Sequence, residues 1–139
     1  MCMKSARGFS ILEILVVIAI MAVLASIVLV TLDTARAKTR DTERITNVQE
    51  VSKALNLYIV NNNTFPVFPE EITLTGDDAF SITLEDEEII SAVPKDPTHP
   101  ARTYTYQSDA SGSTYTLSFC LETDTIPNYS EGCSNTMTP

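Results

Sequence analysis

The feature that most constrains the fold is a long stretch without residues that break helices. From Phe9 to Phe65 the chain runs for 57 consecutive residues with neither glycine nor proline. Both residues are unfavourable inside a helix, and the asparagine run at 61–63, followed by Pro66, supplies a stop signal. The sequence therefore predicts one helix of about 50 residues, roughly 75–80 Å long.

The two halves of this helix differ in their hydrophobic pattern. Nineteen residues, from Ile14 to Leu32, carry no charge, and at about 1.5 Å per residue they match the hydrocarbon thickness of a bilayer. The second half is amphipathic, because apolar residues recur there at spacings of three and four. This apolar stripe consists of Ile45, Val48, Val51, Leu55, Tyr58 and Ile59. We expect 9–32 to be a hydrophobic transmembrane helix, and 33–63 to be its amphipathic continuation.

The charged residues of the second half are expected on the opposite, solvated face of the helix. Asp41 and Glu43 precede Arg44, and Glu50 precedes Lys53 by three positions. Such spacings are typical of side-chain pairs on an exposed helix surface.

Residues 64–139 are predicted to form a head that covers the apolar stripe. Threonine and tyrosine alternate over 103–107, and apolar and polar residues alternate over 115–122, with the turn cluster "SDASGS" between them. These patterns predict an antiparallel hairpin, and a hairpin is stable only when something packs on it. The expected fold class is α+β, with the long helix packed against a small antiparallel sheet.

The other parts of the head carry weaker patterns. We expect 66–84 to be irregular apart from a short strand at 80–84, and "EDEEIISAVP" at 85–94 to form a short helix. The tail at 122–139 shows little periodicity and is assigned no regular element.

Charge is distributed in blocks. Residues 1–8 contain Lys4 and Arg7 and no acid, whereas 61–139 contain thirteen acids and two bases, a net charge of −11. The basic start is expected to stay cytoplasmic, which places the acidic head on the other side of a membrane. So acidic a head is a poor candidate for binding the phosphate backbone of nucleic acids, which needs clustered Lys and Arg, and no nucleic-acid partner is expected. A single histidine and the absence of nucleophile or phosphate-loop motifs argue against an enzyme.

Two cysteines of the head offer a covalent link. Cys120 and Cys133 are separated by twelve residues, and in an exported domain two cysteines most simply form one disulfide. The alternative is two unpaired thiols. A metal site is disfavoured, because the sequence has no CxxC motif and His99 lies far from both cysteines.

A family resemblance rests on the N-terminal stretch "RGFSILEILVVIAIMAVLASIVLV". It resembles the type III signal of type IV pilins and type II secretion pseudopilins, which combines a basic leader, Gly, Phe and Glu with a long apolar run. The resemblance implies that prepilin peptidase removes the leader 1–8 by cutting after Gly8, and methylates the new N-terminal Phe9. Glu13 then becomes the fifth residue of the mature chain. The stretch "VPKDPTHPARTYTYQ" is loosely similar to the major pseudopilins.

The resemblance also implies partners and a location. Such proteins are structural subunits of a helical filament, made of copies of one chain together with minor pilins. They start as single-pass proteins of the cytoplasmic membrane, where an inner-membrane platform assembles them into an extracellular pilus or a periplasmic pseudopilus. Adhesion, motility and type II secretion are the roles implied. No cofactor is implied, although related pseudopilins hold calcium near C-terminal loops; Asp124 and Glu131 are the nearest carboxylates here, without a DxDxDG loop.

Glu13 has a physical explanation beside the resemblance. A lone carboxylate in hydrocarbon costs several kcal/mol unless it is paired. Cleavage after Gly8 would create an amine on Phe9, and the amine of one copy could meet Glu13 of another. Three alternatives stay open: an acid at the membrane edge, an ordinary secretory signal, and a single-pass anchor whose acidic head is a binding module.

Overall fold

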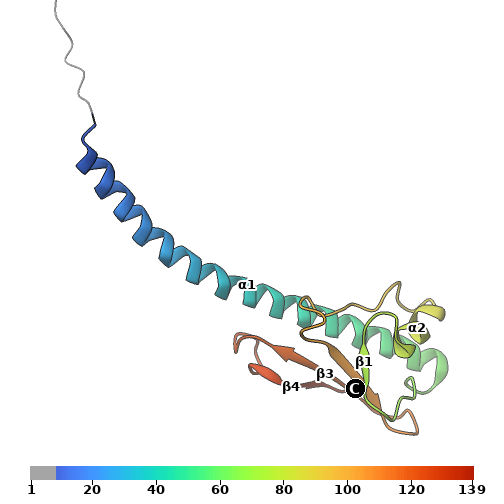
Figure 1. Cartoon of the computed structure of the whole chain (residues 1–139). Coiled ribbons are helices and arrows are strands. Elements are labelled where there is room, and N and C mark those ends of the chain that lie inside the picture. Colours follow the sequence, from blue (N-terminus) through green and yellow to red (C-terminus); the bar gives the residue numbers. More distant parts are fainter. Residues whose placement is uncertain (1–8) are drawn as a thin grey trace, which may run out of the picture. The chain divides into compact units, whose positions relative to one another are not determined.

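A single helix dominates the chain, as predicted. The computed structural model describes residues 9–139, without the side chains of 27–31, so the leader 1–8 lies outside it. Helix α1 spans Ile11–Asn62, 52 residues (Figure 1). The chain divides into two compact units between Arg36 and Ala37, so that α1 contributes its first part to one unit and its last part to the other.

Helix α1 ends in the asparagine run, as the sequence predicts. Its last residue is Asn62, and Asn63 takes a left-handed conformation with φ of 60°. The Asn63 backbone N–H donates to the carbonyl of Ile59 at 2.8 Å. Asparagine tolerates this conformation better than most residues, and it commonly closes helices in this way.

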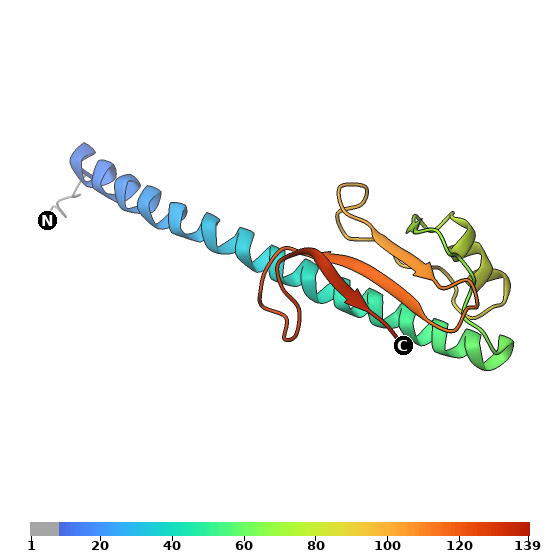
Figure 2. The same cartoon turned by 90° about the horizontal axis from the view of Figure 1, so that it is seen from below.

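The second unit is an antiparallel sheet packed against the last part of α1, a pilin-like α+β arrangement (Figures 1 and 2). The four strands lie in chain order: β1 (Ile72–Leu74), β2 (Tyr104–Ser108), β3 (Tyr115–Leu121) and β4 (Gly132–Met137). Each strand pairs antiparallel with the next. The pair β2–β3 is the predicted hairpin, displaced by one residue at its first strand.

The core lies between the sheet and the apolar stripe of α1. Val48, Val51 and Leu55 are fully buried, and the other three stripe residues are partly buried. Along β3 every second side chain is buried, because a strand packed on one face alternates with a period of two. The aromatic residues of the buried core are Phe65, Phe80, Tyr104, Tyr106, Tyr115 and Phe119.

A second helix replaces two predicted elements. The expected strand at 80–84 and the expected helix at 85–94 are both wrong, because α2 spans Ala79–Asp86. Phe80 and Leu84 are four apart and share the buried face of the helix, whereas Ile82 is 47% exposed. The Asp78 carboxylate caps the helix by accepting from the Ser81 backbone N–H at 3.0 Å.

The two edge strands were not predicted. Strand β1 has three residues inside the segment expected to be irregular, and β4 lies in the tail. Strand β4 lacks an apolar alternation, since its one buried residue is Asn135. The Asn135 amide donates to the carbonyls of Ser130 at 2.8 Å and Gly132 at 2.9 Å, so local polar contacts and pairing with β3 define the strand instead of burial.

Candidate assembly site

The candidate assembly site begins at the N-terminal end of α1. Phe9 and Ser10 precede the helix, and Glu13 stands in its first turn. The Ser10 carbonyl accepts from the backbone N–H of Glu13 at 3.0 Å and of Ile14 at 3.2 Å. A carboxylate in a first turn is also favoured by the positive end of the helix dipole. Phe9 and Glu13 therefore lie within about one turn of each other, whereas Gly8 lies outside the described residues.

The following segment of α1 exposes an unusual amount of apolar surface. Ile11 is 86% exposed and Phe9 is 73% exposed. Other large apolar side chains that are exposed in this unit include Leu12, Ile14, Leu15, Val16, Val17, Ile18, Ile20, Met21, Val23 and Leu24. Contiguous apolar exposure of this kind marks a surface that another molecule covers.

Within the residues that the structure describes, none of the helices has a stretch long and apolar enough to cross a membrane.

In the head, a buried cluster of charges links α1 to two distant segments. Arg44 is fully buried, and its guanidinium contacts three carboxylates. Its Nε donates to Asp96 Oδ2 at 2.7 Å, and its Nη1 donates to Asp41 Oδ1 at 2.8 Å and to Glu122 Oε1 at 2.6 Å. Asp96 lies in the proline-rich turn before β2, and Glu122 directly follows β3. Arg44 thus joins three parts of the head in one place.

Further hydrogen bonds complete the cluster. The Asp41 carboxylate also accepts from the Glu122 backbone N–H at 2.9 Å and from the Thr123 hydroxyl at 2.8 Å. Arg40 and Arg102 bind Glu122 from two sides, at 2.5 Å and 3.1 Å. Three guanidinium groups therefore balance three carboxylates, and no buried side-chain polar atom among the described residues lacks a partner. Burial of charge is tolerated here because every group is paired.

The cluster shifts the pKa values of its members. Hydrogen bonds from Arg40, with further contacts from Arg44, lower the pKa of Glu122 to about 2. Burial alone would raise the pKa of Asp96, but hydrogen bonds from Arg44 and Thr98 outweigh burial and lower that pKa. Burial would lower the pKa of Arg44, yet its bonds to Asp96, Glu122 and Asp41 raise it. All three residues are therefore charged at neutral pH.

The expectation that Asp41 and Arg44 lie on a solvated face is wrong, because both are fully buried. Asp41 and Arg44 are three positions apart, a spacing that is also typical of surface pairs, and this led to the expectation of a solvated face. Positions 41 and 44 continue the spacing of Val48, Val51 and Leu55 toward the N-terminus, and so lie on the same face of α1. Burial of this charged pair could have been predicted from the sequence, because its positions fall on the same helix face as the apolar stripe. Asp96 and Glu122 show no such pattern.

The predicted disulfide is present. Cys120 of β3 and Cys133 of β4 are joined, with an S–S distance of 2.05 Å. Within the loop that the bond closes, Asp124 Oδ1 accepts from the Glu131 backbone N–H at 2.5 Å. The structure therefore brings together the two residues weighed as calcium ligands, although the Asp124 carboxylate stabilises the loop directly. In the described part of the chain, no group of three His, Cys, Asp or Glu side chains is placed to hold a metal ion.

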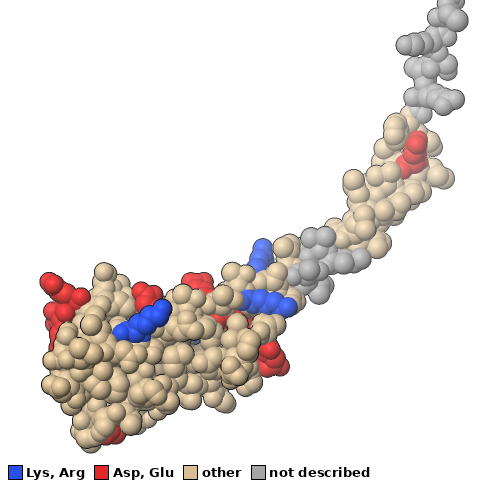
Figure 3. All heavy atoms as spheres, turned by 180° about the vertical axis from the view of Figure 1, so that it is seen from behind, with Lys and Arg blue, Asp and Glu red and all other residues tan. Residues whose placement is uncertain are grey.

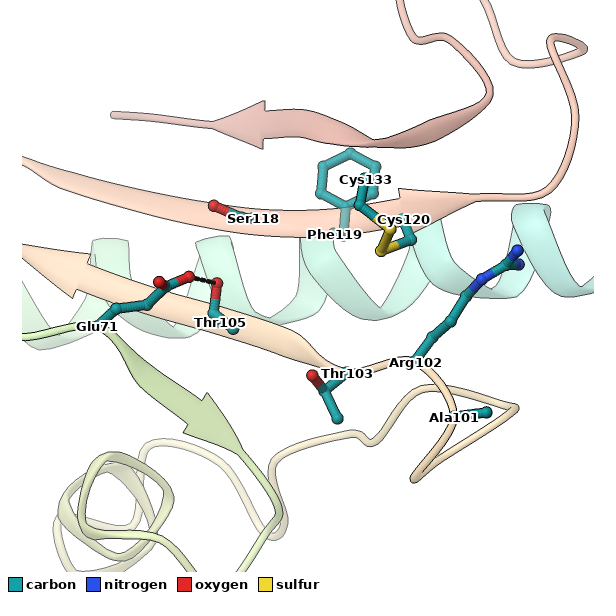
Figure 4. Close-up of a pocket in the computed structure, with 9 residues that line it drawn as sticks. All are labelled: Glu71, Ala101, Arg102, Thr103, Thr105, Ser118, Phe119, Cys120 and Cys133. Carbon is teal, nitrogen blue, oxygen red and sulfur yellow. Dashed lines mark hydrogen bonds between the residues drawn. A yellow bond between two sulfur atoms is a disulfide. The ribbon is translucent and has the colours of Figure 1, made fainter.

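A shallow polar groove lies on the sheet face that bears the disulfide (Figure 4). Its volume is about 340 Å³, and the Glu71 carboxylate accepts from the Thr105 hydroxyl at one side of it. Arg102, at another side, is engaged with Glu122. The groove is lined by hydroxyl groups, by Glu71 and Arg102, each of which already has a partner, and by the disulfide.

Comparison with known proteins gives one match. Residues 3–29 match the prokaryotic N-terminal methylation motif. This segment covers Phe9, Glu13 and the exposed apolar part of α1, and it does not include the head. No curated protein and no solved structure matches the chain.

Replacing Arg44 by alanine should destabilise the head strongly. Removal of one partner from a buried ion pair leaves uncompensated charges and costs about 3–5 kcal/mol of unfolding free energy. Lys95→Ala is the matched control, because Lys95 is 48% exposed and only faces Asp77 at 3.7 Å; its loss should cost less than about 1 kcal/mol. Urea unfolding of the full chain in detergent, followed by tyrosine fluorescence, measures both. Equal losses from the two variants would contradict the structural role of the cluster.

The head should lose stability as the pH falls from about 4 toward 2. The pKa values of Glu122 and Asp96 are lower in the folded protein than the value of about 4 expected for an unfolded chain. Their contribution to the free energy of unfolding is therefore complete above pH ~4, and it is lost at lower pH as both carboxylates of the folded protein take up protons. Urea midpoints between pH 5 and 2.5 should fall less steeply for Glu122→Gln than for the native sequence. If the urea midpoints of both proteins fell with the same slope, the pKa of Glu122 would be the same in the folded and unfolded states, which would contradict this account.

Proposed function

We propose that this chain is a structural subunit of a filament and not an enzyme. The proposal starts from the N-terminal methylation motif, which is typical of type IV pilins and pseudopilins, both of them structural proteins. The filament is a type IV pilus or a related pseudopilus. The observation that carries the proposal is the apolar segment of α1, which is exposed on all sides and has Glu13 in its first turn. A surface of that kind needs other copies, or lipid, to cover it.

Maturation would begin with hydrolysis of the peptide bond between Gly8 and Phe9. Water adds across that bond, which leaves a carboxylate on Gly8 and an amine on Phe9. Prepilin peptidase is the enzyme that such motifs imply. It would then transfer a methyl group from a sulfonium donor to the amine: the new N–C bond forms as the C–S bond breaks, the donor leaves as a thioether, and the nitrogen releases a proton. The cut removes Lys4 and Arg7, so the mature chain begins directly with an apolar residue.

The new amine supplies the partner that Glu13 lacks. Phe9 and Glu13 of one chain lie at the same end of α1, so two copies offset along their helices can bring the amine of one to the carboxylate of the other. Pairing removes the cost of holding either charge in an apolar surrounding. Because only one offset satisfies both groups, the pair selects one register among the many that apolar packing alone allows.

The location follows from the same proposal. Before assembly the apolar segment 9–32 holds the chain in the cytoplasmic membrane as a single-pass protein, with the acidic head outside the cytoplasm. An inner-membrane platform then transfers it into the filament, together with minor pilins. Residues 33–63 and the head 64–139 remain folded around the core and the Arg44 cluster, so assembly needs no rearrangement of the head.

Glu13→Ala should still reach the membrane but should assemble poorly. We expect filament yield to fall roughly tenfold or more, because a charged partner is left unpaired in an apolar contact. Asp33→Ala is the control: it also removes an acid from α1, but the Asp33 side chain is 82% exposed and lies 3.5 Å from Arg36 on the helix surface. Sedimentation of sheared filaments and negative-stain microscopy measure the yield. Normal filaments from the Glu13 variant would contradict the pairing. A native chain that stays in the membrane with its leader intact would favour an anchored binding module.

A further inference from the structure

Two segments of the chain have the pattern Asn-x-Ser/Thr, in which x is not proline. They are Asn62-Asn63-Thr64, where α1 ends, and Asn128-Tyr129-Ser130, in the loop that the disulfide closes. In an exported protein this pattern is the acceptor for N-linked glycosylation, in which a sugar is joined to the asparagine amide. The structure leaves one of these two acceptors accessible and holds the other.

We propose that Asn128 is the attachment site of an N-linked glycan whose first sugar lies in a groove between the loop and β4. The inference goes beyond the proposed filament function and shares with it only the location of the head outside the cytoplasm. The bond between Cys120 and Cys133 supports that location, since disulfides persist in oxidising compartments. Three observations support the site: the turn that presents Asn128, the groove, and the open edge of the sheet.

Asn128 stands at the tip of a tight turn. The Tyr129 backbone N–H donates to the carbonyl of Ile126 at 3.3 Å, so Pro127 and Asn128 occupy the two central positions. Asn128 has φ of 69°, and proline followed by a residue with positive φ is typical of a type II turn. Asn128 and Ser130 are both exposed, and neither side chain forms a hydrogen bond within the described residues. The amide and the hydroxyl of this pattern are therefore both accessible to an enzyme.

The other pattern is held by the fold. Asn62 is the last residue of α1, and its amide donates to Glu87 Oε2 at 2.6 Å and to the carbonyl of Tyr58 at 3.3 Å. Both hydrogens of that amide are in use, so transfer of a sugar to Asn62 would break these bonds. The chain thus contains a matched control for Asn128.

The transfer needs a sugar donor, and the chemistry of the head identifies its class. The donor is an oligosaccharide carried on a polyprenyl phosphate in the membrane, and the Asn128 amide nitrogen attacks its anomeric carbon. One N–C bond forms as the C–O bond to phosphate breaks, the lipid phosphate leaves with the electron pair, and the nitrogen releases one proton. The Ser130 hydroxyl is needed for recognition by the transferase and is not consumed.

A polar groove of about 450 Å³ begins at Asn128. Its walls are the loop and β4, and the residues that line it are all uncharged: Asn128, Tyr129, Ser130, Ser134, Asn135 and Thr136. The Tyr129 ring is packed edge-on against Phe119, with ring centroids 5.1 Å apart. The exposed hydroxyls of Ser134 and Thr136 can donate to and accept from the hydroxyls of a sugar. Neutral donors and acceptors beside a fixed ring suit a neutral sugar residue.

The groove lies along an edge of the sheet that is left open. Among the described strands, β4 pairs with β3 alone. Proteins commonly protect such an edge with charged residues, with proline or with a cover. Acidic groups lie on the surface of the head (Figure 3), yet 132–137 contains neither a charged residue nor a proline. A glycan on Asn128 would lie across β4 and would hinder edge-to-edge pairing of two copies.

Mass spectrometry of the native protein tests the site. The full-length chain is purified from its native membrane, digested, and fragmented by electron transfer, which leaves sugars on their residues. We expect a glycan mass on the peptide that contains Asn128 and none on the peptide that contains Asn62. An unmodified Asn128 would overturn the proposal. Equal modification of Asn62 would also overturn it, because the folded head would not then select the site.

Variants identify the linkage. Asn128→Gln should lose the glycan completely, because the longer side chain displaces the acceptor nitrogen. Ser130→Ala should lose it too, although it leaves the Asn128 amide in place, whereas Ser130→Thr and Asn62→Gln should keep it. A glycan that persists in Asn128→Gln, as one linked to a serine or threonine hydroxyl would, contradicts the proposal.

A separate measurement tests the cover of β4. In detergent, light scattering from Asn128→Gln should exceed that from Asn62→Gln roughly twofold or more, because the edge of β4 is uncovered. Equal scattering would contradict the covering role.

The outcomes are distinguishable from those of the filament proposal. Filaments built of unmodified subunits would overturn the glycan and leave the filament function intact. A chain that bears the glycan on Asn128 but forms no filament would overturn the filament function and leave this inference intact.

Discussion

The head depends on a single buried guanidinium. Arg44 lies on the same face of α1 as the apolar stripe, and it binds carboxylates from α1 itself, from the proline-rich turn before β2 and from the residue after β3. An apolar core can tolerate small shifts of a sheet along a helix, because dispersion contacts are not directional. Directional bonds to Arg44 fix that position. All of these bonds lie within the second unit, so they fix the sheet on the last part of α1.

The same helix therefore serves two purposes through different faces. Within the head, one face of α1 is committed to folding through Val48, Val51 and Leu55, and the opposite face is exposed. From Ile11 to Leu24, within the described residues, large apolar side chains are exposed on every side of the helix. The head, residues 37–139, is a compact unit of its own, and its core is built without residues of the first unit. The division of α1 is thus consistent with a subunit that folds before it assembles.

Features set by local pattern were predictable from the sequence, and features set by distant contacts were not. The length of α1, its stop at the asparagines, its apolar stripe and the β2–β3 hairpin followed from periodicity and turn residues. Helix α2 was mistaken for a strand because Phe80, Ile82 and Leu84 alternate over too few residues to distinguish the two periods. Strand β4 escaped notice because Asn135, not an apolar residue, is its buried member.

The Arg44 cluster shows the same limit most clearly. Its members lie at positions 44, 96 and 122, and no local pattern relates them. Asp41 and Arg44 could have been recognised as buried from their phase with the stripe, but their partners could not. At the candidate assembly site the roles of Phe9 and Glu13 stay a prediction, which rests on the local spacing of Gly8, Phe9 and Glu13 before a long apolar run.

The most direct measurement of the central claim is the intact mass of the mature protein purified from its native membrane, together with the sequence of its first residues. A filament subunit of this kind should begin at Phe9 and carry one added methyl group on its amine, with residues 1–8 absent. The amine on Phe9 is the partner proposed for Glu13. Its presence is therefore required for the pairing between copies and for the register that this pairing selects. A protein that retains Met1 to Gly8, or that begins beyond Glu13, would contradict the account.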